Sequence, residues 1–126
     1  MDEDRDVRLT QRVIGLAIEV HCRLGPGLLE SAYQTCLCHE LTLAGVPFVR
    51  QKALPVHYKG AQLDCQYQMD IVVDDYLVLE IKSVATIHPV HEAQPLTDLR
   101  LSGYRLGLLL NFNCVMLKDG IRRRRL

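Results

Sequence analysis

The sequence lacks several features that would place a protein in a class immediately. It has no excess charge of one sign, because 15 Lys and Arg residues balance 15 Asp and Glu residues, so no overall positive field attracts nucleic acid. No apolar run approaches the roughly 20 residues that span a bilayer, which argues against a membrane protein. The first six residues are acidic and polar, unlike a signal peptide, and they predict a cytoplasmic location.

Cysteine and histidine patterns typical of metal sites are also missing. The five cysteines include no Cys-x-x-Cys pair, and the five histidines lack the spacing of a zinc site. We expect reduced thiols that pack as small hydrophobic groups, with a metal or cluster site and a disulfide as the alternatives.

What the sequence does contain is an ordinary globular composition, and its 126 residues predict a single domain over residues 1–126. Apolar residues recur every three or four positions over residues 8–24 and 28–44, which predicts two amphipathic helices. A third helix is expected over residues 88–102. Pro95 inside it either kinks the helix or leaves its first part as a separate turn.

Strands are expected between and after these helices. Residues 48–58 and 62–73 have strand composition around a turn at Lys59 and Gly60, and a tight connection leads into an apolar strand over 76–82. Residues 106–111 are typical of a strand buried on both faces, and residues 115–117 predict a short edge strand. The order indicates an α/β fold, a mixed β-sheet core flanked by helices.

Three charged residues converge in this arrangement. Glu80 and Lys82 close the apolar strand and are two positions apart, so they share one face. Pairing across the connection at residues 74–75 places Asp70 opposite Leu79 or Glu80. Burying unpaired charges is costly, so these residues need either a function or a mutual ion pair.

This group of residues could form a metal site. Two carboxylates, Asp70 and Glu80, together with the backbone carbonyl of Ile81, form an open oxygen site for Mg²⁺ or Mn²⁺. Lys82 could orient an attacking water beside the ion. The alternative is a Glu–Lys ion pair beside an unrelated aspartate.

The same motifs resemble those of the PD-(D/E)XK nuclease superfamily. Asp70 and the run Glu80-Ile81-Lys82 lie on strands between helices, and residues 27–33, Gly-Leu-Leu-Glu-Ser-Ala-Tyr, match the GxxExxY signature of a family of small prokaryotic proteins within it. Further matching motifs follow in order at 91–94, 110–113 and 118–120. The resemblance implies a restriction-endonuclease-like αβββαβ architecture and a nuclease activity.

The resemblance also implies roles for other residues. Glu30, in the first turn of the second helix, is either a further metal ligand or a helix-start acid without a functional contact. Gln94 would support Lys82 or a metal-bound water. Tyr33 is a core residue with a bonded hydroxyl or a substrate contact, and His91 is a substrate contact or an ordinary surface-helix residue.

The leading hypothesis is therefore a metal-dependent nuclease acting on DNA or RNA. The neutral charge leaves open a catalytically silent module that binds nucleic acid or a protein partner, and an ion-pair network in a structural subunit is a weaker alternative. Arg122 to Arg125 form either a solvated tail or one that contacts phosphate or a partner, with Arg122 and Arg123 as candidate substrate contacts. A homodimer is compatible with the small size of the chain.

Overall fold

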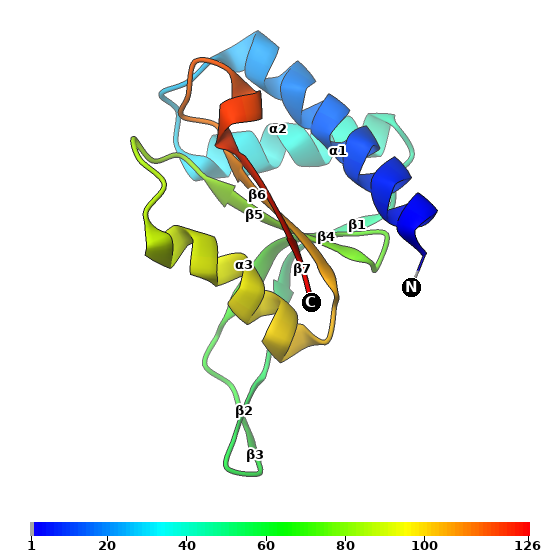
Figure 1. The fold of residues 1–126 in the computed structure, drawn as a ribbon, viewed down its shortest axis with the longest axis vertical. Coiled ribbons are helices and arrows are strands. Elements are labelled where there is room, and N and C mark those ends of the chain that lie inside the picture. Colours follow the sequence, from blue (N-terminus) through cyan, green and yellow to red (C-terminus); the bar gives the residue numbers. More distant parts are fainter. Residues whose placement is uncertain (1) are drawn as a thin grey trace.

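The computed structural model describes residues 2–126 and shows helices on both faces of a mixed β-sheet (Figure 1). The elements in chain order are α1 (Glu3–Leu24), α2 (Glu30–Leu43), β1 (Phe48–Ala53), β2 (Val56–Tyr58), β3 (Ala61–Leu63), β4 (Gln68–Val73), β5 (Leu77–Lys82), α3 (Pro89–Ser102), β6 (Leu106–Asn111), the 3₁₀ helix η1 (Leu117–Gly120) and β7 (Ile121–Arg125). The expected α/β class is confirmed.

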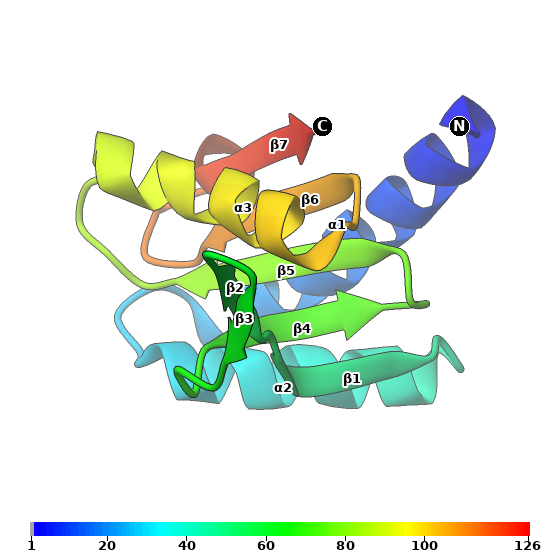
Figure 2. The same ribbon diagram turned by 90° about the horizontal axis from the view of Figure 1, so that it is seen from below.

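The main sheet has the strand order β1-β4-β5-β6-β7. Only β5 and β6 run parallel, because α3 connects them as a crossover helix. This crossover places α3 on one face of the sheet, while α1 and α2 cover the other (Figure 2). Two hydrophobic cores result, a large one beneath α1 and α2 and a smaller one beneath α3.

Two tight turns organise the strands before α3. Lys59 and Gly60 have φ of 50° and 79°, and Asp74 and Asp75 have φ of 54° and 48°, as in the type I′ turns that suit the twist of a hairpin. Both turns lie where the sequence predicted them. The β2–β3 hairpin forms a separate two-stranded sheet that projects from the main body (Figure 1).

The strand bounds in this region differ from the expectation. The segment 48–58 is divided between β1 and β2 at Pro55, and residues 64–67, between β3 and β4, form no strand. Proline has no N–H for a ladder bond, which explains the first division.

Helices α1 and α3 also differ from their expected form. Helix α1 starts five residues earlier than predicted, because Asp2 accepts a hydrogen bond from the Arg5 N–H at 3.0 Å and so caps the first turn. Helix α3 continues through Pro95 as a single α-helix, so a separate first turn is wrong. No helix in the described part of the chain has the length and hydrophobicity of a membrane span.

The C-terminal segment is the largest correction to the sequence-based expectation. Residues 115–116 form no strand, and the basic block is the edge strand β7, paired antiparallel with β6 from Leu110↔Ile121 to Leu106↔Arg125. A free, solvated tail is therefore wrong. The backbone of β7 pairs with the second edge of the apolar strand β6. The apolar stems of the arginine side chains can pack on the protein while their guanidinium groups stay in water.

The cysteines are free thiols, as expected, but they are not uniformly buried. Only Cys38 is buried, and Cys22 and Cys65 are exposed. The prediction that the thiols act as packed hydrophobic groups therefore applies to Cys38 alone among these three.

Candidate active site

The side chains of Glu80 and Lys82 lie on the face of the sheet that α3 covers. Leu79 and Ile81 belong to the core beneath α1 and α2, whereas Val78 packs in the core beneath α3. Since side chains alternate along a strand, Glu80 and Lys82 share the face of Val78. The predicted geometry of β5 is thus present in the structure.

Asp70 lies beside Glu80 at the point where β4 and β5 stop pairing. The last paired residues are Ile71 and Leu79, and the same register places Asp70 opposite Glu80 as the next pair of positions. Beyond that pair, the Asp70 carboxylate replaces a backbone acceptor: its Oδ2 accepts a hydrogen bond from the Ile81 N–H at 2.7 Å. The aspartate therefore occupies a fixed position.

The same hydrogen bond shows where the Ile81 carbonyl lies. The N–H and C=O of one strand residue point toward the same neighbouring strand. Because the Ile81 N–H meets Asp70, the Ile81 carbonyl also lies on the β4 side of β5, next to Asp70. A carbonyl in this position supplies a third oxygen near the two carboxylates.

Glu80 is the most electrostatically perturbed residue of this group. Its side chain is 7% exposed, and this burial is the main cause that raises its pKa from 4.5 to about 9. The negative charges of Asp70 and Asp98 and a hydrogen bond with Asp70 raise the pKa further. The positive charge of Lys82 lowers it. In the absence of a cation, Glu80 therefore holds a proton near neutral pH.

Helix α3 contributes two polar side chains above these residues. Gln94, predicted from the sequence, and Asp98, which the sequence did not single out, are four residues apart and share a helix face. Asp98 is completely buried, and its Oδ1 accepts a hydrogen bond from the Tyr67 hydroxyl at 2.7 Å. Burial is the main cause that raises the pKa of Asp98, and the charge of Asp70 adds to it.

A signal for Asp98 does exist in the sequence. It lies at helical spacing after Gln94 and directly before Leu99, which is fully buried in the core beneath α3. An aspartate between inward-facing positions of an otherwise apolar helix face is a candidate for a buried polar role.

Glu30 lies at the same end of β5 but apart from the pair. It is the first residue of α2, and the loop before it contacts the end of β5, where the Ser83 hydroxyl donates a hydrogen bond to the Leu28 carbonyl at 2.5 Å. Glu30 is half-buried and makes no hydrogen bond or ion pair within residues 2–126. It is not among the groups that shift the pKa of Glu80.

Tyr33 is a core residue. It is fully buried and stacks on Phe112 with ring centroids 4.5 Å apart. Its hydroxyl donates to the Gly25 carbonyl at 2.6 Å and accepts from the Leu28 N–H at 3.2 Å. The side chain therefore anchors the loop between α1 and α2, and its ring has no exposed surface for a substrate contact in this structure.

His91 and Arg122 are engaged in contacts within the fold. The His91 Nδ1 accepts a hydrogen bond from the His88 N–H at 3.0 Å, which caps the start of α3. The Arg122 Nε contacts the carboxylate of Glu92 at 3.2 Å, and Arg124 lies 3.8 Å from the same oxygen. Glu92 thus joins α3 to β7 beside the candidate site.

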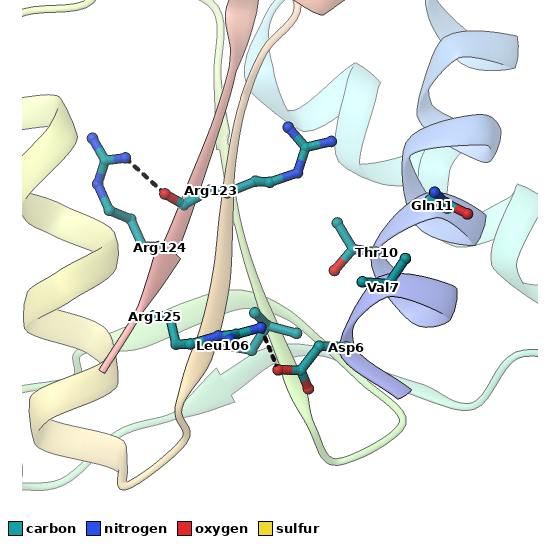
Figure 3. A pocket seen from close by; sticks show the side chains of 8 residues that line it. All are labelled: Asp6, Val7, Thr10, Gln11, Leu106, Arg123, Arg124 and Arg125. Atoms are coloured by element: carbon teal, nitrogen blue, oxygen red, sulfur yellow. Dashed lines mark hydrogen bonds and ion pairs between the residues drawn. The ribbon is translucent and has the colours of Figure 1, made fainter. Parts of the chain in front are cut away.

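Arg123 lies on the opposite side of the sheet from Arg122 and Arg124. Figure 3 shows Arg123 directed toward α1 and Arg124 directed toward α3. Together with Arg125, which binds Asp6 at 2.6 Å, Arg123 lines a cavity of about 390 Å³ between β7 and α1. The structure therefore separates the two arginines that the sequence grouped as substrate contacts.

The donor set fits a divalent ion bound mainly through oxygen. Within residues 2–126, no three His, Cys, Asp or Glu side chains are grouped so that they alone could hold a metal. Asp70, Glu80 and the Ile81 carbonyl would leave several positions to water, which is how Mg²⁺ is usually held. Two buried oxygens on α3, Oε1 of Gln94 and Oδ2 of Asp98, have no hydrogen-bond partner among residues 2–126.

Comparison with known families agrees with this geometry. The model of the PD-(D/E)XK nuclease superfamily matches residues 7–124, a range that begins in α1 and ends in β7. The chain belongs to the PD-(D/E)XK nuclease superfamily. A search of curated proteins and a search of solved structures found no significant match.

Proposed function

We propose that this chain is a metal-dependent nuclease that hydrolyses phosphodiester bonds of DNA or RNA, with Mg²⁺ or Mn²⁺ as its ion. The observation that carries the proposal is that two carboxylates and a lysine lie together where β4 and β5 stop pairing with each other. There Asp70 is fixed by the Ile81 N–H and Glu80 is buried among acidic groups. Buried like charges are costly unless a cation offsets them.

In this proposal, Asp70, Glu80 and the Ile81 carbonyl hold the ion. A divalent ion in such a site lowers the pKa of bound water and neutralises charge on the phosphate. Lys82, one residue beyond the Ile81 carbonyl, would orient the attacking water and stabilise the negative charge that develops on the phosphate oxygens. Gln94 would assist from α3 through its side-chain amide.

Glu30 would approach this group only if α2 or the loop before it moved when substrate binds. The half-buried position of Glu30 and its free carboxylate support a role as an additional ligand. His91, Arg122 and Arg123 are weaker candidates for substrate contacts. Arg122 would have to leave Glu92, and Arg123 lies on the other face of the sheet.

Finer assignments also belong to the proposal. The residues from Gly27 to Tyr33 support membership of the GxxExxY family within the superfamily, and the continuous sheet supports one domain over residues 1–126. A cytoplasmic location is also part of the proposal. A homodimer would let two sites act on both strands of a duplex.

The test is cleavage by the purified chain of single-stranded, duplex and branched DNA and RNA, with Mg²⁺, Mn²⁺ or EDTA. Lys82→Met should reduce the ion-dependent rate by about 10²- to 10³-fold without unfolding the protein. Lys118→Met, which makes the same chemical change at an exposed position of η1, is the control. Equal activity of both variants, or no cleavage of any substrate by the wild-type chain, would contradict the proposal.

A silent binding module would give a different result. It would bind nucleic acid without cleaving it, and its affinity would fall when Arg122 to Arg125 are neutralised but not in Glu80→Gln. Because Arg122 contacts Glu92, the nucleic acid would have to displace Glu92 in order to bind Arg122.

A further inference from the structure

Two oxygen atoms on α3 are buried without a partner. They are Oε1 of Gln94 and Oδ2 of Asp98, and no donor within residues 2–126 reaches either of them. Residues four apart in a helix lie above one another on the same face. The two atoms therefore form a pair of unused acceptors on the inner face of α3.

The free oxygen of Asp98 is costly for the fold. Asp98 is 0% exposed, and the Tyr67 hydroxyl satisfies only its Oδ1. A buried acceptor without a donor destabilises the folded state, and the cost is larger when the group is charged. Native proteins satisfy most buried polar groups, so an exception calls for a water, an ion or a functional role.

The charges around Asp98 show which residues lie near its carboxyl group. Asp70 and Lys82 both act on the Asp98 carboxyl, and Asp98 in turn acts on Glu80. Asp98 therefore lies among the residues that would hold the ion, on the opposite side from the strands. It is a third carboxylate at the site, contributed by the helix.

Direct coordination by all three carboxylates does not agree with the structure. No three acidic side chains within residues 2–126 are close enough together to hold an ion by themselves. An ion held by Asp70, Glu80 and one carbonyl keeps several water molecules. Coordinated waters are strong hydrogen-bond donors, and Oδ2 of Asp98 and Oε1 of Gln94 are acceptors.

We propose that Asp98 is part of the ion site: its Oδ2, together with Oε1 of Gln94, accepts hydrogen bonds from the water molecules of a divalent ion held by Asp70 and Glu80. Asp98 is thus a positioning residue that acts through water. This inference rests on the ion-binding part of the proposed function. It also explains why Tyr67 holds Oδ1 of Asp98, since that bond directs Oδ2 toward the ion.

The test is the affinity of the protein for Mn²⁺, measured by titration calorimetry without nucleic acid. In Asp98→Asn, an NH₂ group can replace Oδ2 while the remaining oxygen keeps the bond from Tyr67. The dissociation constant should rise about 10- to 100-fold. Asp119→Asn, which removes one negative charge from an exposed position, should leave it unchanged.

Two further readouts separate this role from a structural one. A carboxylate needed only for folding would make Asp98→Asn less stable without metal, whereas removal of an unsatisfied buried oxygen should leave the metal-free melting temperature equal or higher. Manganese spin-resonance spectra should show altered hydration of the ion in Asp98→Asn. If that variant does not fold, Gln94→Leu provides the second test and should weaken Mn²⁺ binding.

The outcomes distinguish this inference from the proposed function. If the wild-type chain binds Mn²⁺ and Glu80→Gln does not, but Asp98→Asn binds as tightly as wild type, Asp98 is not part of the ion site and the proposed nuclease stands. If the wild-type chain binds no Mn²⁺, both the inference and the metal-dependent function are wrong.

Discussion

Replacing Glu80 with glutamine should stabilise the metal-free protein at neutral pH, although it removes a central residue of the candidate active site. Glutamine resembles the protonated carboxyl group that the folded protein prefers. In the folded state, burial and the charges of Asp70 and Asp98 raise the pKa of Glu80 from 4.5 to about 9. In the unfolded chain the same carboxyl ionises near its ordinary pKa of about 4.3.

The expected size follows from the linkage between proton binding and folding. Because the folded pKa is raised, the contribution of Glu80 to stability is complete below about pH 4.5 and is lost as the pH rises toward 9. Each pH unit in this window costs about 1.4 kcal/mol, so the loss at pH 7 is about 3–4 kcal/mol. The raised pKa already includes the opposing charge of Lys82, so we expect Glu80→Gln to gain about 3–4 kcal/mol at pH 7.

Urea denaturation in EDTA between pH 4.5 and pH 8 measures this difference directly. The gain of Glu80→Gln over wild type should be near zero at the lowest pH and should grow as the pH rises. Glu40→Gln, at a half-buried position of α2 where the side chain makes no hydrogen bond within residues 2–126, should show no such trend. A pH-independent difference, or a Glu80→Gln protein that is less stable at pH 7, would refute the reasoning.

Adding Mn²⁺ should remove most of this difference in stability. An ion that binds only the folded state stabilises it by about 2.7 kcal/mol at a concentration one hundred times its dissociation constant. The wild-type chain should gain this stability and Glu80→Gln should not. Equal stabilisation of both proteins would show that Glu80 does not hold the ion.

Three further substitutions test the packing around the site. Gly120→Ala should destabilise the protein by about 1–3 kcal/mol in urea denaturation, because the added Cβ would overlap the carbonyl oxygen of Asn111. Gly15→Ala, on α1 with no atom near the added group, should instead stabilise it by up to about 1 kcal/mol, and equal effects would contradict the contact. Tyr33→Phe should lower the unfolding free energy by about 1–2 kcal/mol and leave substrate affinity unchanged. Weaker substrate binding with unchanged stability would show instead that Tyr33 contacts the substrate.

The candidate active site was largely predictable from local sequence because strand geometry is local. The spacing of Glu80 and Lys82 places both on one face, and the turn at residues 74–75 sets which residues of β4 and β5 are opposite. The register of Ile71 with Leu79 agrees with that expectation. The hydrogen bond from the Ile81 N–H to Asp70 was not predictable, because it forms only where the two strands stop pairing.

The C-terminal strand and the buried aspartate of α3 required the tertiary structure. Arg122 to Arg125 show no alternation between apolar and polar residues, so the pattern that identifies a strand is absent. Their strand forms because β6 offers an unpaired edge. Asp98 has helical spacing after Gln94 in sequence, which allows a surface or a buried position, and only the packing of α3 on the sheet buries it.

Asp70, Glu80 and Lys82 were therefore determined by the sequence alone, since a period of two and one tight turn suffice to bring them together. The tertiary structure decided what surrounds them. The crossover through α3 places Asp98 and Gln94 above the pair, and the pairing of β7 directs Arg122 and Arg123 to opposite faces. These arrangements depend on contacts between segments far apart in the chain, where local periodicity carries no information.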